Sequence, residues 1–261
     1  MRSAVLGLVL VLAGGGAFAA APAGMARVGP GALRPVYAPD PSTTMIDVGA
    51  FELDRVPVTN GEFLDFVRGH PQWRRDRVAH MFADDGYLLH WAGPVELGPK
   101  AAPDQPVTHV SWFAAKAYCA TQSKRLPTET EWEFAAAAGE KSADGSAEPG
   151  FRERTLAWYS RPAGARLATV GRGTPNYWGV FDLNGLVWEW VLDFNSTLVS
   201  GDSRTGASAD RMQFCGAGAL AAGDKQDYAS FMRLALRGSL EARYTTSALG
   251  FRCARDAEAA R

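Results

Sequence analysis

The segment 179–191 constrains the fold of this chain more than any other part. It encloses Glu189 between two tryptophans and contains an Asn184-Gly185 pair. Asn and Gly both tolerate positive φ, so the pair predicts a tight turn. Asp182 precedes this turn and Glu189 follows it, so carboxylates and backbone carbonyls could surround one hard cation, which prefers oxygen ligands. The alternative is a turn followed by a buried aromatic strand in which a buried arginine neutralises Glu189.

The composition is that of an ordinary globular protein. The chain has 261 residues, of which 47% are apolar and 21% charged, and its formal net charge is −1. This length suffices for one large domain or two small ones, and the balanced charge argues against a nucleic-acid partner. Eight Trp and 28 Gly suggest a compact fold with long loops and bulky anchoring side chains.

The first residues have the pattern of a secretory signal. Arg2 is followed by an apolar run over 4–13 and by small residues at 17–19, so we expect 1–19 to be a cleaved signal peptide. The run is too short to be a membrane anchor, and no later segment approaches eighteen apolar residues. We therefore expect a periplasmic or secreted protein that does not span a membrane. Residues 20–44 are rich in Ala, Gly and Pro and predict a flexible tether.

The cysteines and histidines are further candidates for a disulfide and for metal binding. The chain has three cysteines, Cys119, Cys215 and Cys253, so an oxidising compartment predicts one disulfide and one spare thiol, without indicating which. His80 and His90 lie ten residues apart on predicted loops and could ligate a metal, or could make local hydrogen bonds instead.

Capping signals predict three of the helices. Thr59 and Glu62 have the spacing of a capping box, ahead of a helix that ends at Gly69. Ser111 begins a helix over 112–122, and Thr128 begins one over 129–138. Acidic residues lie at the start of this last helix, where they could form a catalytic cluster or could simply stabilise the helix N-terminus: Glu129, Glu131 and Glu133. We expect a loop over 141–154 and strands over 106–110 and 233–236.

A last strand near the C-terminus carries an arginine. We expect this strand over 249–254, and an arginine inside a strand predicts a buried ion pair of Arg252 with Glu189 or Glu133.

Several segments together resemble one family. They are 55–63, 106–112 followed by 117–119, 125–133, the segment 179–191, and 249–253. In this order and spacing they are similar to the formylglycine-generating enzymes, also called sulfatase-modifying factors. The resemblance implies one α+β domain over 45–257 with the complex C-type-lectin-like fold, rich in loops and poor in regular secondary structure.

The resemblance also implies roles for individual residues. Cys119 and Cys253 match two family cysteines that form a disulfide. The resemblance further implies a calcium site. Its ligands would be the side chains of Asp182 and Glu189 and the backbone carbonyls of Gly185 and Val187. The family often has Asn after the glycine, where this chain has Leu186.

The catalytic residues of the family are missing. Its enzymes oxidise a substrate cysteine with two thiols that hold Cu(I), a soft ion that needs thiolates. The corresponding positions here are Ala221 and Ala229, and Cys215 is the one spare thiol. A copper cofactor at this site is therefore not expected.

These observations predict an exported binding or maturation factor whose client is a periplasmic protein or peptide. Divergent relatives include accessory proteins found with copper nitrite reductase and the periplasmic factor of pyoverdine maturation. One alternative is a metal-dependent oxidoreductase of this family with His80, His90 and Cys215 as ligands. Another is a lectin-like module that binds peptide or glycan through Trp73, Trp91 and Tyr177.

Overall fold

The computed structural model describes residues 24–35, 44–159, 166–194 and 225–257. The predicted signal peptide 1–19 and Cys215 lie outside these ranges. Among the described residues, no helix is long and apolar enough to cross a bilayer.

A three-stranded antiparallel sheet joins the two ends of the described chain. Its order is β1 (Met25–Val28), β4 (Phe51–Asp54) and β7 (Ala254–Asp256), with β4 in the centre. β1 pairs with β4 along its whole length, and Val28 is fully buried. The tether expected over 20–44 is therefore wrong for the part that contains β1, and the domain begins well before residue 45.

Two smaller sheets complete the strand content of the described residues. β2 (Gly31–Leu33) pairs antiparallel with β3 (Ile46–Val48). β5 (Trp188–Glu189) pairs parallel with β6 (Leu249–Gly250). The second pairing brings the end of the segment 179–191 beside the segment that contains Arg252.

The helices begin where the capping residues predict. Thr59 and Thr128 each form a full capping box at the start of α1 (Asn60–Gly69) and α3 (Glu129–Ala136). Ser111 accepts a hydrogen bond from the backbone of Ala114 at the start of α2 (Trp112–Thr121). The remaining helical segments of the described residues are α4 (Phe151–Tyr159), α6 (Lys225–Ser239), and the short 3₁₀ turns η1 (Pro71–Trp73) and η2 (Gly145–Ala147).

Four local expectations are wrong. The strand expected over 249–254 is divided into β6 and β7, and Arg252 lies in the link between them. Residues 233–236 belong to helix α6 and not to a strand. The loop expected over 141–154 contains η2 and the start of α4. The strand expected over 106–110 is reduced to a single bridge between Pro106 and Thr59.

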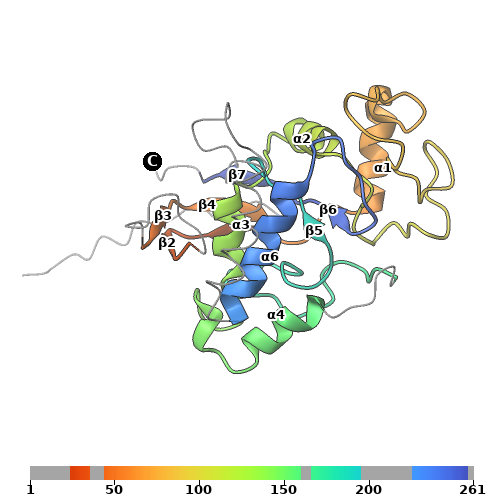
Figure 1. The fold of residues 1–261 in the computed structure, drawn as a ribbon. Helices are drawn as coiled ribbons and strands as arrows, with labels where there is room; N and C mark the ends of the chain where they lie inside the picture. Colours follow the sequence, from red (N-terminus) through yellow and green to blue (C-terminus); the bar gives the residue numbers. More distant parts are fainter. Residues whose placement is uncertain (1–23, 36–43, 160–165, 195–224, 258–261) are drawn as a thin grey trace, which may run out of the picture.

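One hydrophobic core holds these elements together. It draws buried side chains from the central sheet, from α1, α2 and α3, and from the segment 179–191. Helices α3 and α6 lie side by side in front of the sheet, and α4 lies across the lower end of α6 (Figure 1). The fold is thus mixed α and β with long loops, as expected.

Candidate functional site

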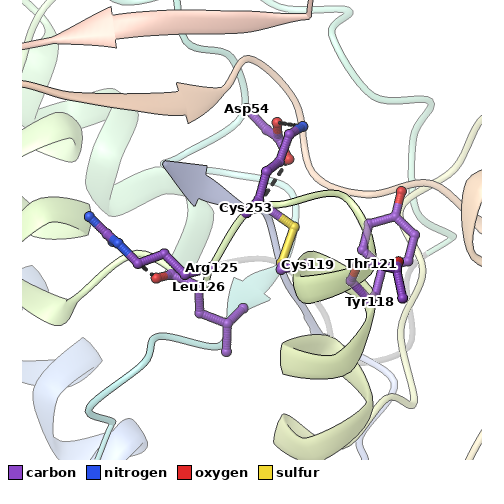
Figure 2. Close-up of a disulfide and its surroundings, with 8 residues drawn as sticks. Asp54, Tyr118, Cys119, Thr121, Arg125, Leu126 and Cys253 are labelled. Carbon is purple, nitrogen blue, oxygen red and sulfur yellow. Dashed lines mark hydrogen bonds and ion pairs between the residues drawn. A yellow bond between two sulfur atoms is a disulfide. The ribbon is translucent and has the colours of Figure 1, made fainter. Parts of the chain in front are cut away.

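The disulfide implied by the resemblance is present. Cys119 on α2 is bonded to Cys253, just before β7, across a sequence separation of 134 residues, and both are fully buried (Figure 2). Beside it, Asp54 accepts hydrogen bonds from the Cys253 backbone N–H at 3.0 Å and from Lys124 Nζ at 2.6 Å. Burial raises the pKa of Asp54 despite these bonds. Of the three cysteines, only Cys215 remains outside this bond.

Glu189 is neutralised by a buried arginine. Arg252 donates from Nε to Glu189 Oε2 and from Nη2 to Oε1, both at 2.8 Å, and neither side chain is exposed. Trp132 donates from Nε1 to the same Oε2 at 2.7 Å. Arg252 also donates to the backbone carbonyls of Asp54 and Phe181. Of the two interpretations of this segment, the structure shows the buried ion pair.

The other implied calcium ligands lie around the turn. Asp182 has φ of +63°, which Asp tolerates better than most residues, and its carboxylate accepts a hydrogen bond from the Gly171 N–H at 2.6 Å. Burial raises the pKa of this carboxyl. Val187 is buried, and Gly185 has φ of +151°. Glu189 does not fit the role of a calcium ligand here, because Arg252 engages both its oxygens and a guanidinium opposes a divalent cation.

Chelation tests this conclusion. We expect calcium added to the EDTA-treated chain to leave its melting temperature unchanged, because the Glu189–Arg252 pair supplies the charge balance that calcium would otherwise provide. Differential scanning fluorimetry with and without added calcium measures the effect. A fall in melting temperature on chelation that calcium reverses, and that Asp182→Asn abolishes, would establish a calcium site at this turn instead.

A second buried ion-pair network joins α3 to α6. Arg233 donates to Glu133 at 2.7 Å, and Arg237 donates to Glu133 at 2.8 Å and to Glu129 at 3.2 Å. All four side chains are at most 10% exposed. Both guanidinium groups lie over the ring of Trp132, that of Arg237 at 4.6 Å from its centroid. The network therefore attaches α6 to α3 through paired charges on an aromatic surface.

The three glutamates do not form a free catalytic cluster. Burial alone would raise the pKa of Glu133, but Arg233 and Arg237 hold it below its usual value, so this carboxylate stays ionised. Glu129 is paired with Arg237, and Glu131 closes the capping box and binds Arg125 at 2.7 Å. All three side chains therefore stabilise the structure around α3.

The positions of the family's catalytic cysteines fall on and before α6. Ala229 is 1% exposed within this helix, one turn before Arg233. Ala221 lies outside the described residues. The described member of the pair is thus a small buried side chain in a helix.

The structure gives His80 and His90 separate local partners, which is the second of the two alternatives for these residues. His80 is 89% exposed and lies 3.4 Å from Asp85. His90 instead packs against His109, with ring centroids 5.0 Å apart. Burial, then His109 and Arg75, lower the pKa of His90 to about 4, and burial lowers the pKa of His109. His109 is absent from the predicted ligands, because this residue lies inside the segment 106–112, which contributes only to the family resemblance. The chain has four histidines, so His109 could have been included as a candidate.

The aromatic surface expected for a lectin-like module does not form. Trp91 is 3% exposed and belongs to the hydrophobic core, and Trp73 is partly buried against it. Only Tyr177 of the three is exposed, at 52%.

Comparisons with known proteins agree with these features. The family model of the sulfatase-modifying factor enzyme 1-like domain matches residues 7–257. The formylglycine-generating enzyme of Streptomyces coelicolor is 32% identical over 249 residues, covering 80% of this chain and 79% of that protein. The inactive C-alpha-formylglycine-generating enzyme 2 of Mus musculus is 35% identical over 184 residues, covering 56% of this chain and 59% of that one.

One further sequence relative and two solved structures also align with this chain. The hercynine oxygenase of Mycobacterium tuberculosis is 34% identical over 166 residues, which cover 56% of this chain and 38% of that protein. The structure of PvdO from Pseudomonas aeruginosa aligns with a TM-score of 0.50 and 19% identity, over 89% of this chain and 94% of that one. CarF aligns with a TM-score of 0.50 and 16% identity, over 90% of this chain and 98% of that chain. The chain thus belongs to the sulfatase-modifying factor family, whose members include formylglycine-generating enzymes, an inactive relative and hercynine oxygenases.

Proposed function

We propose that this chain is an exported member of the family without copper oxidase activity, which binds or matures a client protein or peptide in the periplasm. The observation that carries the proposal is the cysteine count. Of the three cysteines, two are joined in a buried disulfide, so a single thiol is left. One thiolate cannot build a two-thiolate Cu(I) site.

The positions aligned with the catalytic cysteines support the same conclusion. Ala229 is buried in α6, and the sequence has Ala at 221 as well. An alanine methyl group offers no electron pair to a metal or to a substrate thiol. A family relative described as inactive shows that the fold is used without this chemistry.

The fold supports a role in recognition. A fully buried disulfide and two buried ion-pair networks give a rigid framework, on which long loops are positioned for binding. The signal pattern of the first residues supports a client in the same exported compartment. A copper enzyme such as nitrite reductase is the client that the divergent relatives suggest.

The first test is enzymatic. We expect no formation of an aldehyde on a cysteine-containing sulfatase-type peptide, with or without added Cu(I), as measured by mass spectrometry. The Streptomyces coelicolor enzyme serves as the positive control. Cys215→Ser should change neither this result nor client binding. Aldehyde formation that Cys215→Ser abolishes would overturn the proposal and return the chain to the oxidases.

The second part of the test identifies the client. The mature chain, immobilised through its C-terminus, is incubated with periplasmic extract of the organism that encodes it, and bound proteins are identified by mass spectrometry. We expect one exported protein to be enriched over an unrelated exported control protein. If the immobilised chain enriches no protein, or enriches only contaminating cytoplasmic proteins, the result would contradict the binding role.

A further inference from the structure

His90 and His109 form a half-buried imidazole pair where two loops meet. Their ring centroids lie 5.0 Å apart, with 27° between the ring planes. The Leu88 N–H donates to the His109 carbonyl at 2.9 Å and fixes the two loops together. Leu88 and His109 have φ of +50° and +53°, a conformation that a bulky residue rarely adopts. Both loops are therefore held in unusual conformations beside the two rings.

The hydrogen bonds of Asn60 fix the tautomer of His90. Asn60 Nδ2 donates to the carbonyl oxygens of Ala102 and Gln105 at 3.1 and 3.3 Å, so Oδ1 is the atom that faces the ring. This oxygen accepts from Trp91 Nε1 at 3.0 Å and lies 3.3 Å from His90 Nε2. Because an amide oxygen only accepts, Nε2 carries the hydrogen, and His90 Nδ1 presents a lone pair.

His109 also has a ring nitrogen without a partner. The Nδ1 atoms of both histidines are buried, and within the described part of the chain neither has a hydrogen-bond partner. A buried N–H without an acceptor is rarer than a buried acceptor without a donor, so Nε2 of His109 carries the hydrogen and Nδ1 presents a lone pair.

Two buried lone pairs on adjacent rings require a partner. An unpaired buried acceptor costs free energy, and an ion or an ordered water is the usual explanation. Metal-binding histidines typically donate their other ring N–H to an oxygen acceptor, as His90 does here to Asn60 Oδ1. Two imidazoles that bind one ion at about 2.1 Å also bring their centroids to about 5 Å from each other.

We propose that the Nδ1 atoms of His90 and His109 form a two-imidazole site for a transition-metal ion that prefers nitrogen ligands, Zn(II) or Cu(II). Imidazole suits these ions, whereas calcium requires oxygen. The described residues offer no cluster of three or more His, Cys, Asp or Glu side chains. The ion therefore has open positions, which water or a group of the client fills.

The surrounding charges suit such an ion. Arg75 donates to the carbonyls of Leu88 and Trp91 and lies near His90, where its charge opposes a cation. Asp84 lies near His109 and favours one. Burial favours the neutral form of both imidazoles, which is the form that binds metal.

The test uses the mature chain without a histidine tag, loaded with Zn(II) or Cu(II) alone. Isothermal titration should give one ion per chain, and His90→Gln should weaken binding by at least about tenfold. His80→Asn is the matched control, because His80 is exposed and far less constrained, and it should leave the affinity unchanged. Circular dichroism of each variant establishes that it is folded.

A measurement on the unaltered chain makes the test independent of the variants. The electron paramagnetic resonance spectrum of the Cu(II) form should show hyperfine structure from two nitrogen ligands. Zn(II) should also shift the Nδ1 resonances of His90 and His109 in ¹⁵N NMR spectra. No metal uptake, or unchanged ring resonances, would overturn the proposal and assign an ordered water to the two lone pairs. Binding that His80→Asn abolishes would overturn it as well.

Discussion

Replacing Arg252 by Met is expected to destabilise the protein by about 3–5 kcal/mol, the usual effect of removing one partner of a buried ion pair. The substitution keeps most of the side-chain volume but leaves the Glu189 carboxylate without its counter-charge at a position with no solvent exposure. It also removes the donors to the carbonyls of Asp54 and Phe181. Urea unfolding followed by tryptophan fluorescence measures the difference in unfolding free energy.

Two controls separate this effect from a general loss of charge. Arg68→Met removes an exposed ion pair with Asp65, with side chains 57% and 80% exposed, and should change stability by less than about 0.5 kcal/mol. Combining Arg252→Met with Glu189→Leu should recover part of the loss, because no charge remains unpaired. Equal effects of Arg252→Met and Arg68→Met would contradict the role of the buried pair.

Removing the disulfide is expected to cost about 4–5 kcal/mol. The paired substitution Cys119→Ala with Cys253→Ala opens a loop with a sequence separation of 134 residues, and the chain-entropy model assigns this value to so long a loop. Alanine is chosen because both sulfur atoms are fully buried and serine would add an unpaired hydroxyl. Urea unfolding of the variant and the parent under non-reducing conditions gives the difference.

Cys215→Ser is the matched control for the disulfide and should have little effect on stability. Peptide mapping by mass spectrometry without reduction provides an independent check of the pairing. A bridge that contains Cys215, or a loss of under about 1 kcal/mol in the paired variant, would contradict the structural role of this bond.

The sequence predicted features whose signals are local or come from the family resemblance. The caps at Thr59, Ser111 and Thr128 are short-range patterns, and all three hold. The buried arginine at 252 was expected to pair with Glu189 or Glu133, because an arginine inside a strand needs a carboxylate. The choice between the two depends on the pairing of β5 with β6, which the sequence does not specify.

Other features depend on contacts distant in the sequence. β1 is a short strand in a segment rich in Gly and Ala, and only its partner β4 defines it. The ion-pair network between α3 and α6 could have been predicted from the spacing of its charged residues. Glu129 and Glu133 are one helical turn apart, as are Arg233 and Arg237, and this shared spacing lets two helices pair their charges. The pairing of His90 with His109 likewise depends on how two loops meet.

The central sheet sets the order in which this protein can complete its folding. β4 pairs on one side with a strand at residues 25–28 and on the other with a strand at 254–256. The residues around 252 also supply the counter-charge of Glu189 and one half of the disulfide. Contacts between segments so far apart form slowly, because the chain must close a long loop before they add stability. During synthesis the core therefore stays incomplete until residues 249–256 have emerged from the ribosome.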